Sequence, residues 1–280
     1  MPTIIATTTI KPNGTQALLL YLSVWVICAV CGAIVIRAAI RSPNFDRWVT
    51  RDIFVVASLG VILEVYDNII GDQFVAPLLE PIPGLEQLQF HDLPYMFVLM
   101  VGVAIVRKPG CVTAMVFINY LLAQLLFGAG HGVLEWTDGL TQGIFCDVYI
   151  VARKGGVCAP GGSRVALLLD GFMIGALRGG PNAFFTNVCF EPYLEAEYHT
   201  VANTIFETWT NALGNGIEAA ISAGLAMRVA HSVVPGLGPG PRAPAGGDGQ
   251  SVLDAWQERE ERADASGGTV GALGAEGETS

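Results

Sequence analysis

Seven apolar segments follow one another along this chain, and they constrain its fold more than any other feature of the sequence. They cover approximately residues 16–40, 52–70, 90–106, 111–128, 138–152, 164–185 and 200–230. Hydrophobic residues make up 52% of the 280 residues and charged residues only 14%, so polar groups are too few to cover a soluble globule. The sequence therefore predicts an all-α, polytopic membrane helix bundle, in which some helices are short or tilted.

Basic and acidic connections alternate between these segments. Cations occupy every second connection: Arg37, Arg41, Arg47 and Arg51, then Arg107 and Lys108 in the turn VRKPG, then Arg153, Lys154 and Arg164, and finally Arg228 and Arg242. The connections between them are acidic, and Arg178, at the end of a segment, is the exception. Because short cytoplasmic loops are rich in Lys and Arg, the pattern predicts a multi-pass protein of the inner (plasma) membrane with its N-terminus outside and its C-terminus in the cytoplasm.

The chain divides into three predicted parts. Residues 1–47 hold an extracellular N-terminus and one extra transmembrane anchor, which lacks the cleavage pattern of a signal peptide. Residues 48–234 form a six-helix core. Residues 235–280 are rich in Gly, Pro, Ala and charge, a composition that cannot bury enough apolar surface to fold, and predict a disordered cytoplasmic tail.

The last apolar segment carries a stripe of polar residues. The stripe consists of Asn203, Glu207, Asn211, Asn215 and Glu218, whose spacing of three and four places them on one face of a helix. Because polar groups that face lipid are costly, this face is expected to contact protein or a wet cavity. The alternative is a set of interhelical hydrogen bonds that only hold the bundle together, each contributing about 0.6 kcal/mol.

Polar residues of other segments lie at the same outer level under this topology. We therefore predict an outward-facing cavity for a small polar molecule, without an intramembrane Lys to neutralise its carboxylates, and expect a cationic or donor-rich ligand. Trp136 and Trp209 are candidates for stacking on that ligand, or alternatively anchor the helices at the interface. Asp170 is expected to meet Arg164 or the cytoplasmic surface instead. The candidate substrate-binding residues are Glu64, Asp67, Asn119, Gln124, Trp136, Gln142, Asn203, Glu207, Trp209 and Asn211.

Signatures of catalysis are missing from the sequence. Nucleotide-binding glycine loops, HExxH and GxSxG do not occur, so we expect neither an enzyme nor a cofactor, and no nucleic-acid partner. The CxxC pair Cys28 and Cys31 lies inside an apolar run, where zinc or redox chemistry lacks its usual loop. No metal site is predicted, although His91, His131 and His199 on the outer side leave a metal-dependent membrane oxidase subunit as a minor alternative.

Three motifs in order resemble a known family. They are WVTRDIFVVASLGVILEVYDNII, LPYMFVLMVGVAIVRKPGCVTAMVFINYLLAQLLFG and GLTQGIFCDVYIVA, within residues 48–152. This part of the chain resembles the substrate-binding (S) components of energy-coupling factor transporters, specifically the YkoE-like group. The resemblance implies a six-helix core, here residues 48–231, that captures thiamine, its hydroxymethylpyrimidine precursor or a similar vitamin-like molecule from outside. It also implies delivery through a transmembrane coupling subunit driven by two ATPase subunits.

The resemblance also implies a partner interface. Ala57 and Gly60 fall where such components carry small residues, although the pattern is imperfect because Val61 lies four residues after Ala57. Arg107 and Lys108 are expected to face the coupling subunit. The chain departs from the family pattern in its first apolar segment, in the acidic loop at 71–92 and in its tail. The first segment offers small pairs four apart, Cys28 with Gly32 and Ala29 with Ala33, that suit close helix contact. A structural or accessory subunit of a larger membrane complex is therefore the alternative function.

Overall fold

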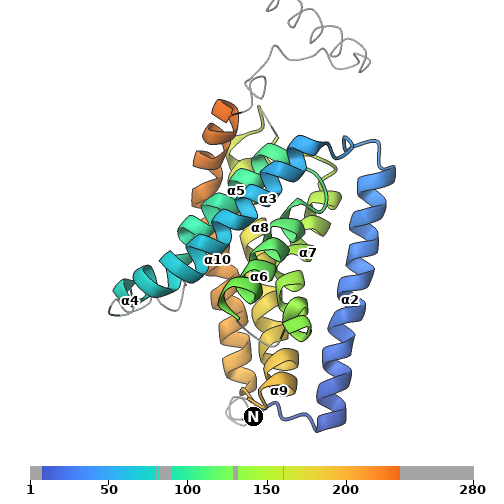
Figure 1. Cartoon of the computed structure of the whole chain (residues 1–280), viewed down its shortest axis with the longest axis vertical. Helices are drawn as coiled ribbons and strands as arrows, with labels where there is room; N and C mark the ends of the chain where they lie inside the picture. Colours follow the sequence, from blue (N-terminus) through green and yellow to red (C-terminus); the bar gives the residue numbers. More distant parts are fainter. Residues whose placement is uncertain (1–7, 80, 82–89, 129–131, 160, 234–280) are drawn as a thin grey trace, which may run out of the picture. The chain divides into compact units, whose positions relative to one another are not determined.

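The computed structural model describes residues 8–79, 81, 90–128, 132–159 and 161–233, and the regular elements among them are helical (Figure 1). This confirms the predicted all-α class. The predicted tail at 235–280 and His131 lie outside the described residues. The elements are α2 (Gly14–Arg41), α3 (Thr50–Glu64), η1 (Val65–Val75), α4 (Ala76–Leu79), η2 (Phe90–Asp92), α5 (Leu93–Val106), α6 (Cys111–Phe127), η3 (Gly132–Glu135), α7 (Trp136–Ala152), α8 (Arg164–Phe185), η4 (Thr186–Phe190), α9 (Glu191–Leu194) and α10 (Val201–Val233).

The long helices after α2 pack on one another as a closed ring. Starting from α3, each contacts the next in the order α6, α7, α8, α10 and α5, and α5 returns to α3. Helix α2 lies outside this ring against α7 and α9, through Tyr21, Val24 and Cys28 on one of its faces. The interior between the other helices is filled by apolar side chains such as Met96, Met115 and Ile174.

The turn VRKPG joins α5 to α6. Arg107 ends α5 in the left-handed conformation (φ 49°) and Gly110 follows at φ 93°, a conformation that glycine adopts without strain. The turn is attached to the residues before α3, because Trp48 Nε1 donates to the Pro109 carbonyl at 3.2 Å and Lys108 Nζ donates to the Arg47 carbonyl at 2.7 Å. Two basic connections that are distant in sequence therefore lie at one end of the bundle.

The second apolar segment is longer in the structure than the sequence indicates. We expected residues 71–92 to form a loop, but the helix continues from α3 through η1 and α4 as far as Leu79. The apolar segment ends at residue 70 and is followed by Gly71, Asp72 and Gln73. The backbone instead widens into π-helical turns, in which the Gln73 side chain donates to the Asn68 carbonyl at 3.0 Å, and apolar residues resume at Phe74.

Apolar side chains cover the outward faces of the helices. On α2, Leu19, Val26 and Ile40 are 61%, 62% and 71% exposed, and α3 and α10 carry similar rows. A soluble monomer rarely exposes apolar surface on this scale. Two helical runs among the described residues, Gly14–Arg41 and Thr50–Leu79, are long and apolar enough to cross a bilayer. These features support association with a membrane.

Helices α8 and α10 approach each other closely enough for backbone contact. Gly171, Gly175 and Gly179 of α8, spaced four apart, lie against the α10 backbone near Ala219, Asn215 and Asn211 respectively. Small residues at this spacing permit close packing of membrane helices. The pairing fixes the register of the two helices that carry most of the polar side chains described below.

Candidate functional site

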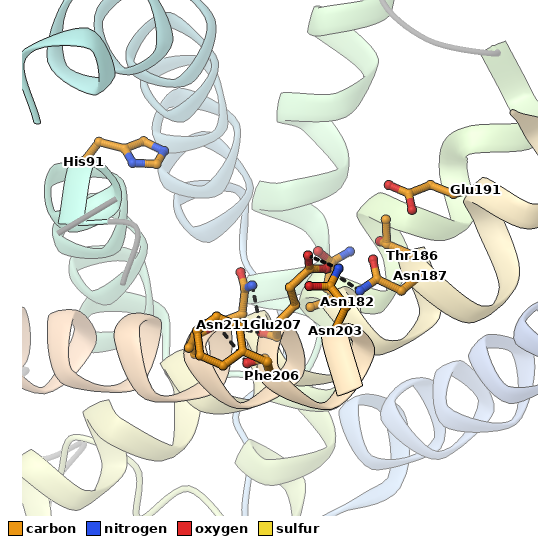
Figure 2. Close-up of a pocket in the computed structure, with 11 residues that line it drawn as sticks. His91, Asn182, Thr186, Asn187, Glu191, Asn203, Phe206, Glu207 and Asn211 are labelled. Atoms are coloured by element: carbon orange, nitrogen blue, oxygen red, sulfur yellow. Dashed lines mark hydrogen bonds between the residues drawn. The ribbon is translucent and has the colours of Figure 1, made fainter. Parts of the chain in front are cut away.

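A cavity of about 590 Å³ lies where α8, η4 and α9 face the first half of α10 (Figure 2). We call it the amide cavity, because four asparagines contribute to its wall. Among the described residues, its lining contains two carboxylates, from Glu191 and Glu207, and neither Lys nor Arg. The lining residues are His91, Asn182, Ala183, Thr186, Asn187, Glu191, Asn203, Phe206, Glu207, Thr210 and Asn211.

Glu207 is the central acceptor of the amide cavity. Its carboxylate accepts one hydrogen bond from Asn203 Nδ2 at 2.7 Å and another from Asn187 Nδ2, while Asn211 Nδ2 donates to its backbone carbonyl at 2.9 Å (Figure 2). Neutral amides orient the carboxylate but do not cancel its charge. The amide cavity thus offers a fixed anionic acceptor to a ligand that carries a positive charge or several N–H or O–H donors.

The second carboxylate of the amide cavity, Glu191, is held by His199. Its carboxylate contacts His199 Nε2, and His199 Nδ1 lies 3.3 Å from Asn203 Nδ2. Burial raises the pKa of Glu191, against the lowering effect of His199. The N-terminal segment holds the backbone of His199 in place, because Ile10 N donates to the His199 carbonyl at 2.8 Å.

A smaller cavity of about 160 Å³ lies between η1, α6 and η3. Its polar wall is internally bonded, since Asn119 Nδ2 donates to Asp67 Oδ2 at 3.1 Å and Trp136 Nε1 donates to Gln124 Oε1 at 2.9 Å. Tyr120, which also lines this cavity, belongs to a cluster of polar side chains from α6, α7 and α8. There the Asp138 carboxylate accepts from Tyr120 and Asn182, and Gln142 Nε2 donates to the Tyr120 hydroxyl at 2.8 Å.

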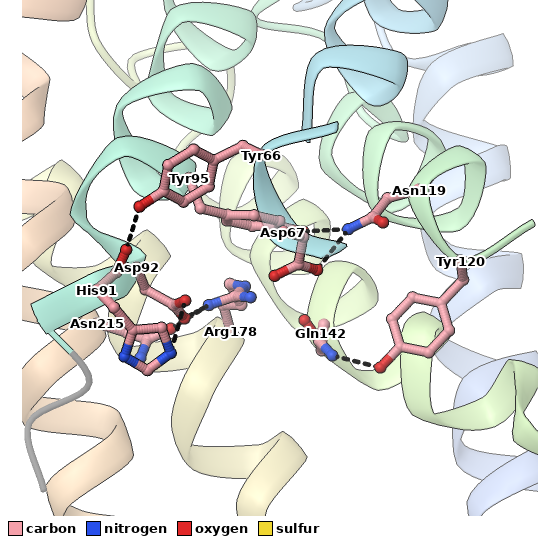
Figure 3. Close-up of polar contacts among 10 residues, drawn as sticks. All are labelled: Tyr66, Asp67, His91, Asp92, Tyr95, Asn119, Tyr120, Gln142, Arg178 and Asn215. Carbon is pink, nitrogen blue, oxygen red and sulfur yellow. Dashed lines mark hydrogen bonds and ion pairs between the residues drawn. The ribbon is translucent and has the colours of Figure 1, made fainter. Parts of the chain in front are cut away.

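Arg178 lies in the interior of the helix ring. It was the exception to the alternation of charges, and the structure explains why, because it is buried and not part of a connection. Arg178 Nη1 donates to Asp92 Oδ2 at 2.9 Å and to Asn215 Oδ1 at 2.5 Å, and the guanidinium lies 4.1 Å from the centre of the Tyr95 ring (Figure 3). Sequence reasoning missed this residue, although the flanking glycines at spacing four signal a buried helix face.

The ten candidate substrate-binding residues are distributed over several places. Asn203, Glu207 and Asn211 line the amide cavity, whereas Asp67, Asn119 and Gln124 line the smaller one. Glu64 and Gln142 are buried and line neither, and Trp136 bonds to Gln124 beside the smaller cavity. Trp209 is 63% exposed in an apolar groove with Phe145 and Phe184, so its ring faces away from the polar side chains.

The carboxylates at the basic end have structural partners. Asp147 accepts hydrogen bonds from the backbone N–H and hydroxyl of Thr113, at 2.7 and 2.5 Å, and thereby caps the start of α6. Asp170 was expected to meet Arg164 or the cytoplasmic surface. It accepts from a different arginine of the same basic connection, Arg153, whose Nε lies at 3.0 Å, and from Tyr149 at 2.7 Å. The loop before α8 brings Arg153 closer to Asp170 than sequence distance suggests.

The residues expected at a partner interface also have contacts within the chain. Gly60 is buried against Ile118 of α6, where an added Cβ would lie 2.8 Å from the Ile118 side chain. Lys108 Nζ pairs with Asp52 Oδ2 at 2.5 Å. Ala57 and Arg107 are half-buried.

Among the described residues, no three His, Cys, Asp or Glu side chains lie close enough together to hold a metal ion. His91 lies 3.6 Å from Asp92 Oδ1, and His199 contacts Glu191. No protein-family model, curated protein or solved structure matches this chain.

Proposed function

We propose that this protein is a multi-pass membrane subunit that captures a small, cationic or donor-rich molecule from outside the cell. The observation that carries the proposal is the anionic amide cavity around Glu207, which has a volume of about 590 Å³ and neither Lys nor Arg among its described lining residues. Glu207 is half-buried, and its carboxylate accepts hydrogen bonds from neutral amides only among the described residues. A carboxylate without a cationic partner within a membrane helix bundle is costly unless it has a function. Binding of a cationic or donor-rich ligand would compensate for that cost.

The proposed orientation follows from the two ends of the bundle. The connections around Trp48, Lys108 and Arg153 lie at the end of the bundle where α5 and α7 finish, whereas the amide cavity lies where α8 finishes and α10 begins. With the basic connections in the cytoplasm, the amide cavity faces outside, as does the N-terminal segment that bonds to His199.

The cargo and partners that we propose come from the family resemblance of residues 48–152. An aminopyrimidine such as hydroxymethylpyrimidine, or thiamine with its cationic ring, would supply donors and charge to Glu207. Import would then require a transmembrane coupling subunit and two ATPase subunits as partners.

Equilibrium binding of labelled thiamine and of labelled hydroxymethylpyrimidine to the purified full chain tests this function. We expect saturable binding of one of them, weakened at least tenfold by Glu207→Gln, which removes the charge and keeps the side-chain size; tenfold corresponds to about 1.4 kcal/mol. Glu197→Gln is the matched control, because Glu197 is an exposed carboxylate outside the amide cavity. Absence of saturable binding for both compounds, or equal affinity of wild type and Glu207→Gln, would overturn the proposal.

A further inference from the structure

Glu218 is a completely buried carboxylate whose two oxygens accept no hydrogen bond from the described residues. It lies on α10, one turn beyond Asn215. Arg178 also has an unsatisfied buried atom, because its Nε–H finds no acceptor among the same residues. Buried polar groups are nearly always bonded, and an unpaired buried charge is strongly destabilising. The carboxylate oxygens of Glu218 and the Nε–H of Arg178 therefore need an explanation, and one contact between them would supply it.

The helix geometry directs the two side chains toward each other. Helices α8 and α10 are antiparallel, and Gly175 of α8 is in contact with Asn215 of α10. Arg178 lies one turn after Gly175, and Glu218 lies one turn after Asn215, so they start on opposite sides of this contact. Side chains on a helix lean toward its N-terminus, which brings both to the level of Asn215. Arg178 already reaches Asn215 Oδ1 at 2.5 Å.

Asp92, the present partner of Arg178, belongs to a different element. It ends η2, the short helix that also carries His91 into the wall of the amide cavity. The Arg178–Asp92 ion pair therefore ties this wall to α8, and Tyr66 adds a second attachment by donating to the His91 carbonyl at 2.5 Å (Figure 3). If Arg178 leaves, Asp92 keeps His91 Nε2 at 3.6 Å as a neighbour.

We propose that Arg178 is a switch with two carboxylate partners, Asp92 in this structure and Glu218 in a second state, and that the exchange detaches η2 from α8. Asn215 and the Tyr95 ring stay within reach of the guanidinium in both states, so only one ion pair is exchanged. The exchange satisfies Glu218 and removes one of the two attachments of the His91 side of the amide cavity, leaving the hydrogen bond from Tyr66. Its meaning for cargo entry or release rests on the function proposed above, whereas the exchange itself does not.

A double-mutant cycle on the full chain in detergent tests the exchange without any cargo. In the wild type, Glu218→Gln removes an unpaired buried carboxylate and is expected to leave the unfolding midpoint unchanged or to raise it. In an Asp92→Asn background, Glu218 becomes the partner of Arg178, so the same substitution is expected to lower the midpoint. An equal effect of Glu218→Gln in both backgrounds would overturn the proposal. An Asp67→Asn background is tested in parallel, because Asp67 also acts electrostatically on Arg178. If Glu218→Gln lowered the midpoint in the Asp67→Asn background and not in the Asp92→Asn background, the proposal would be overturned too.

Hydrogen exchange supplies a second measurement that does not depend on the stability of the Asp92 variant. If the second state frees η2, then Glu218→Gln abolishes that state and slows amide exchange in a peptide beginning at Phe90, relative to wild type. Glu64→Gln is the control, since Glu64 is equally buried and has one unbonded oxygen but bonds to Asn68. Unchanged exchange in Glu218→Gln would overturn the proposal. Failure of thiamine binding in the wild type would refute the proposed cargo and leave this result untouched.

Discussion

Gly175 of α8 lies directly against the carbonyl oxygen of Asn215 on α10, and a Cβ added at Gly175 would come within 2.0 Å of that oxygen. Gly171 and Gly179 make equivalent contacts one turn away on either side, with Cβ distances of 2.7 and 2.6 Å to carbonyl oxygens. These oxygens belong to a helix backbone, so they cannot move without moving α10. The three glycines thus set the distance between the two helices that carry Arg178 and the polar stripe.

The first prediction concerns this contact. Gly175→Ala is expected to destabilise the protein by about 1–3 kcal/mol, the usual cost of overpacking, in spite of the better helix propensity of alanine. Gly224→Ala is the matched control on α10, because nothing lies within 4 Å of a Cβ there. That variant is expected to be neutral or to gain up to about 1 kcal/mol. Thermal unfolding of both variants in the same detergent measures the difference, and equal midpoints would contradict the prediction.

The glycine contact shows what sequence periodicity supplies and what it omits. The spacing of Asn203, Glu207 and Asn211 predicted that they share a helix face, and these three residues do line one cavity. Periodicity does not identify the facing helix, however. The opposite wall comes from Asn182, which follows the internal Pro181 of α8, and from Asn187, which lies in the π-helical turns of η4, where a count of 3.6 residues per turn no longer applies.

The second prediction concerns the ion pair between Lys108 and Asp52. Their side chains are 11% and 1% exposed, and the atoms Nζ and Oδ2 are 2.5 Å apart. Lys108→Met leaves Asp52 buried without its closest cation and removes the bond that attaches the VRKPG turn to Arg47. We expect a loss of about 3 kcal/mol, at the lower end of the range for breaking a buried pair.

The control for this substitution is Arg51→Met. Arg51 also pairs with Asp52, but at 3.5 Å and with a side chain that is 61% exposed. Exposed ion pairs contribute about 0–1 kcal/mol, so Arg51→Met is expected to have little effect on the unfolding free energy. A similar loss for both substitutions would show that total charge near Asp52 matters, not the buried bond to Lys108.

The third prediction concerns Cys158, in the loop between α7 and α8. Burial, with a smaller contribution from the nearby Asp170 carboxylate and against the opposing effect of Arg107, raises the pKa of the Cys158 thiol to about 12. Since the thiolate is the reactive form, we expect Cys158 to resist alkylation by iodoacetamide at pH 8 while the protein is folded. Mass spectrometry of the peptide that contains Cys158 measures the modified fraction, and rapid alkylation of the folded protein at pH 8 would contradict the prediction.

The same thiol makes stability depend on pH in a defined direction. Its folded pKa of about 12 exceeds the ordinary value of 9.0, so the folded state binds the proton more tightly than the unfolded state. The resulting stabilisation is complete below pH 9 and is lost as the pH rises from about 9 to 12. Cys158→Ser, which lacks this titration, is expected to show a weaker decline of the unfolding midpoint across that interval.

The membrane orientation was predicted from the alternation of basic and acidic connections, and Arg178 shows what such a count of charges omits. A count of cations treats every Arg as a loop residue, although this one is buried between Asp92 and Asn215. Its partner Asp92 lies 86 positions earlier in the chain, at the end of a stretch whose composition indicates a loop. Contacts at such separations depend on how the helices are arranged, which local patterns do not encode.

The last prediction concerns that orientation. Asn44 is exposed between Arg41 and Arg47, and Glu195 is exposed in the connection between α9 and α10. If the basic connections are cytoplasmic, a membrane-impermeant maleimide added to intact cells is expected to label Glu195→Cys, and to label Asn44→Cys only after permeabilisation. The wild-type chain gives the background, because its described cysteines are buried except for the half-buried Cys31. Labelling of Asn44→Cys in intact cells would reverse the orientation, and the amide cavity would then open to the cytoplasm and serve export or sensing in place of capture from outside.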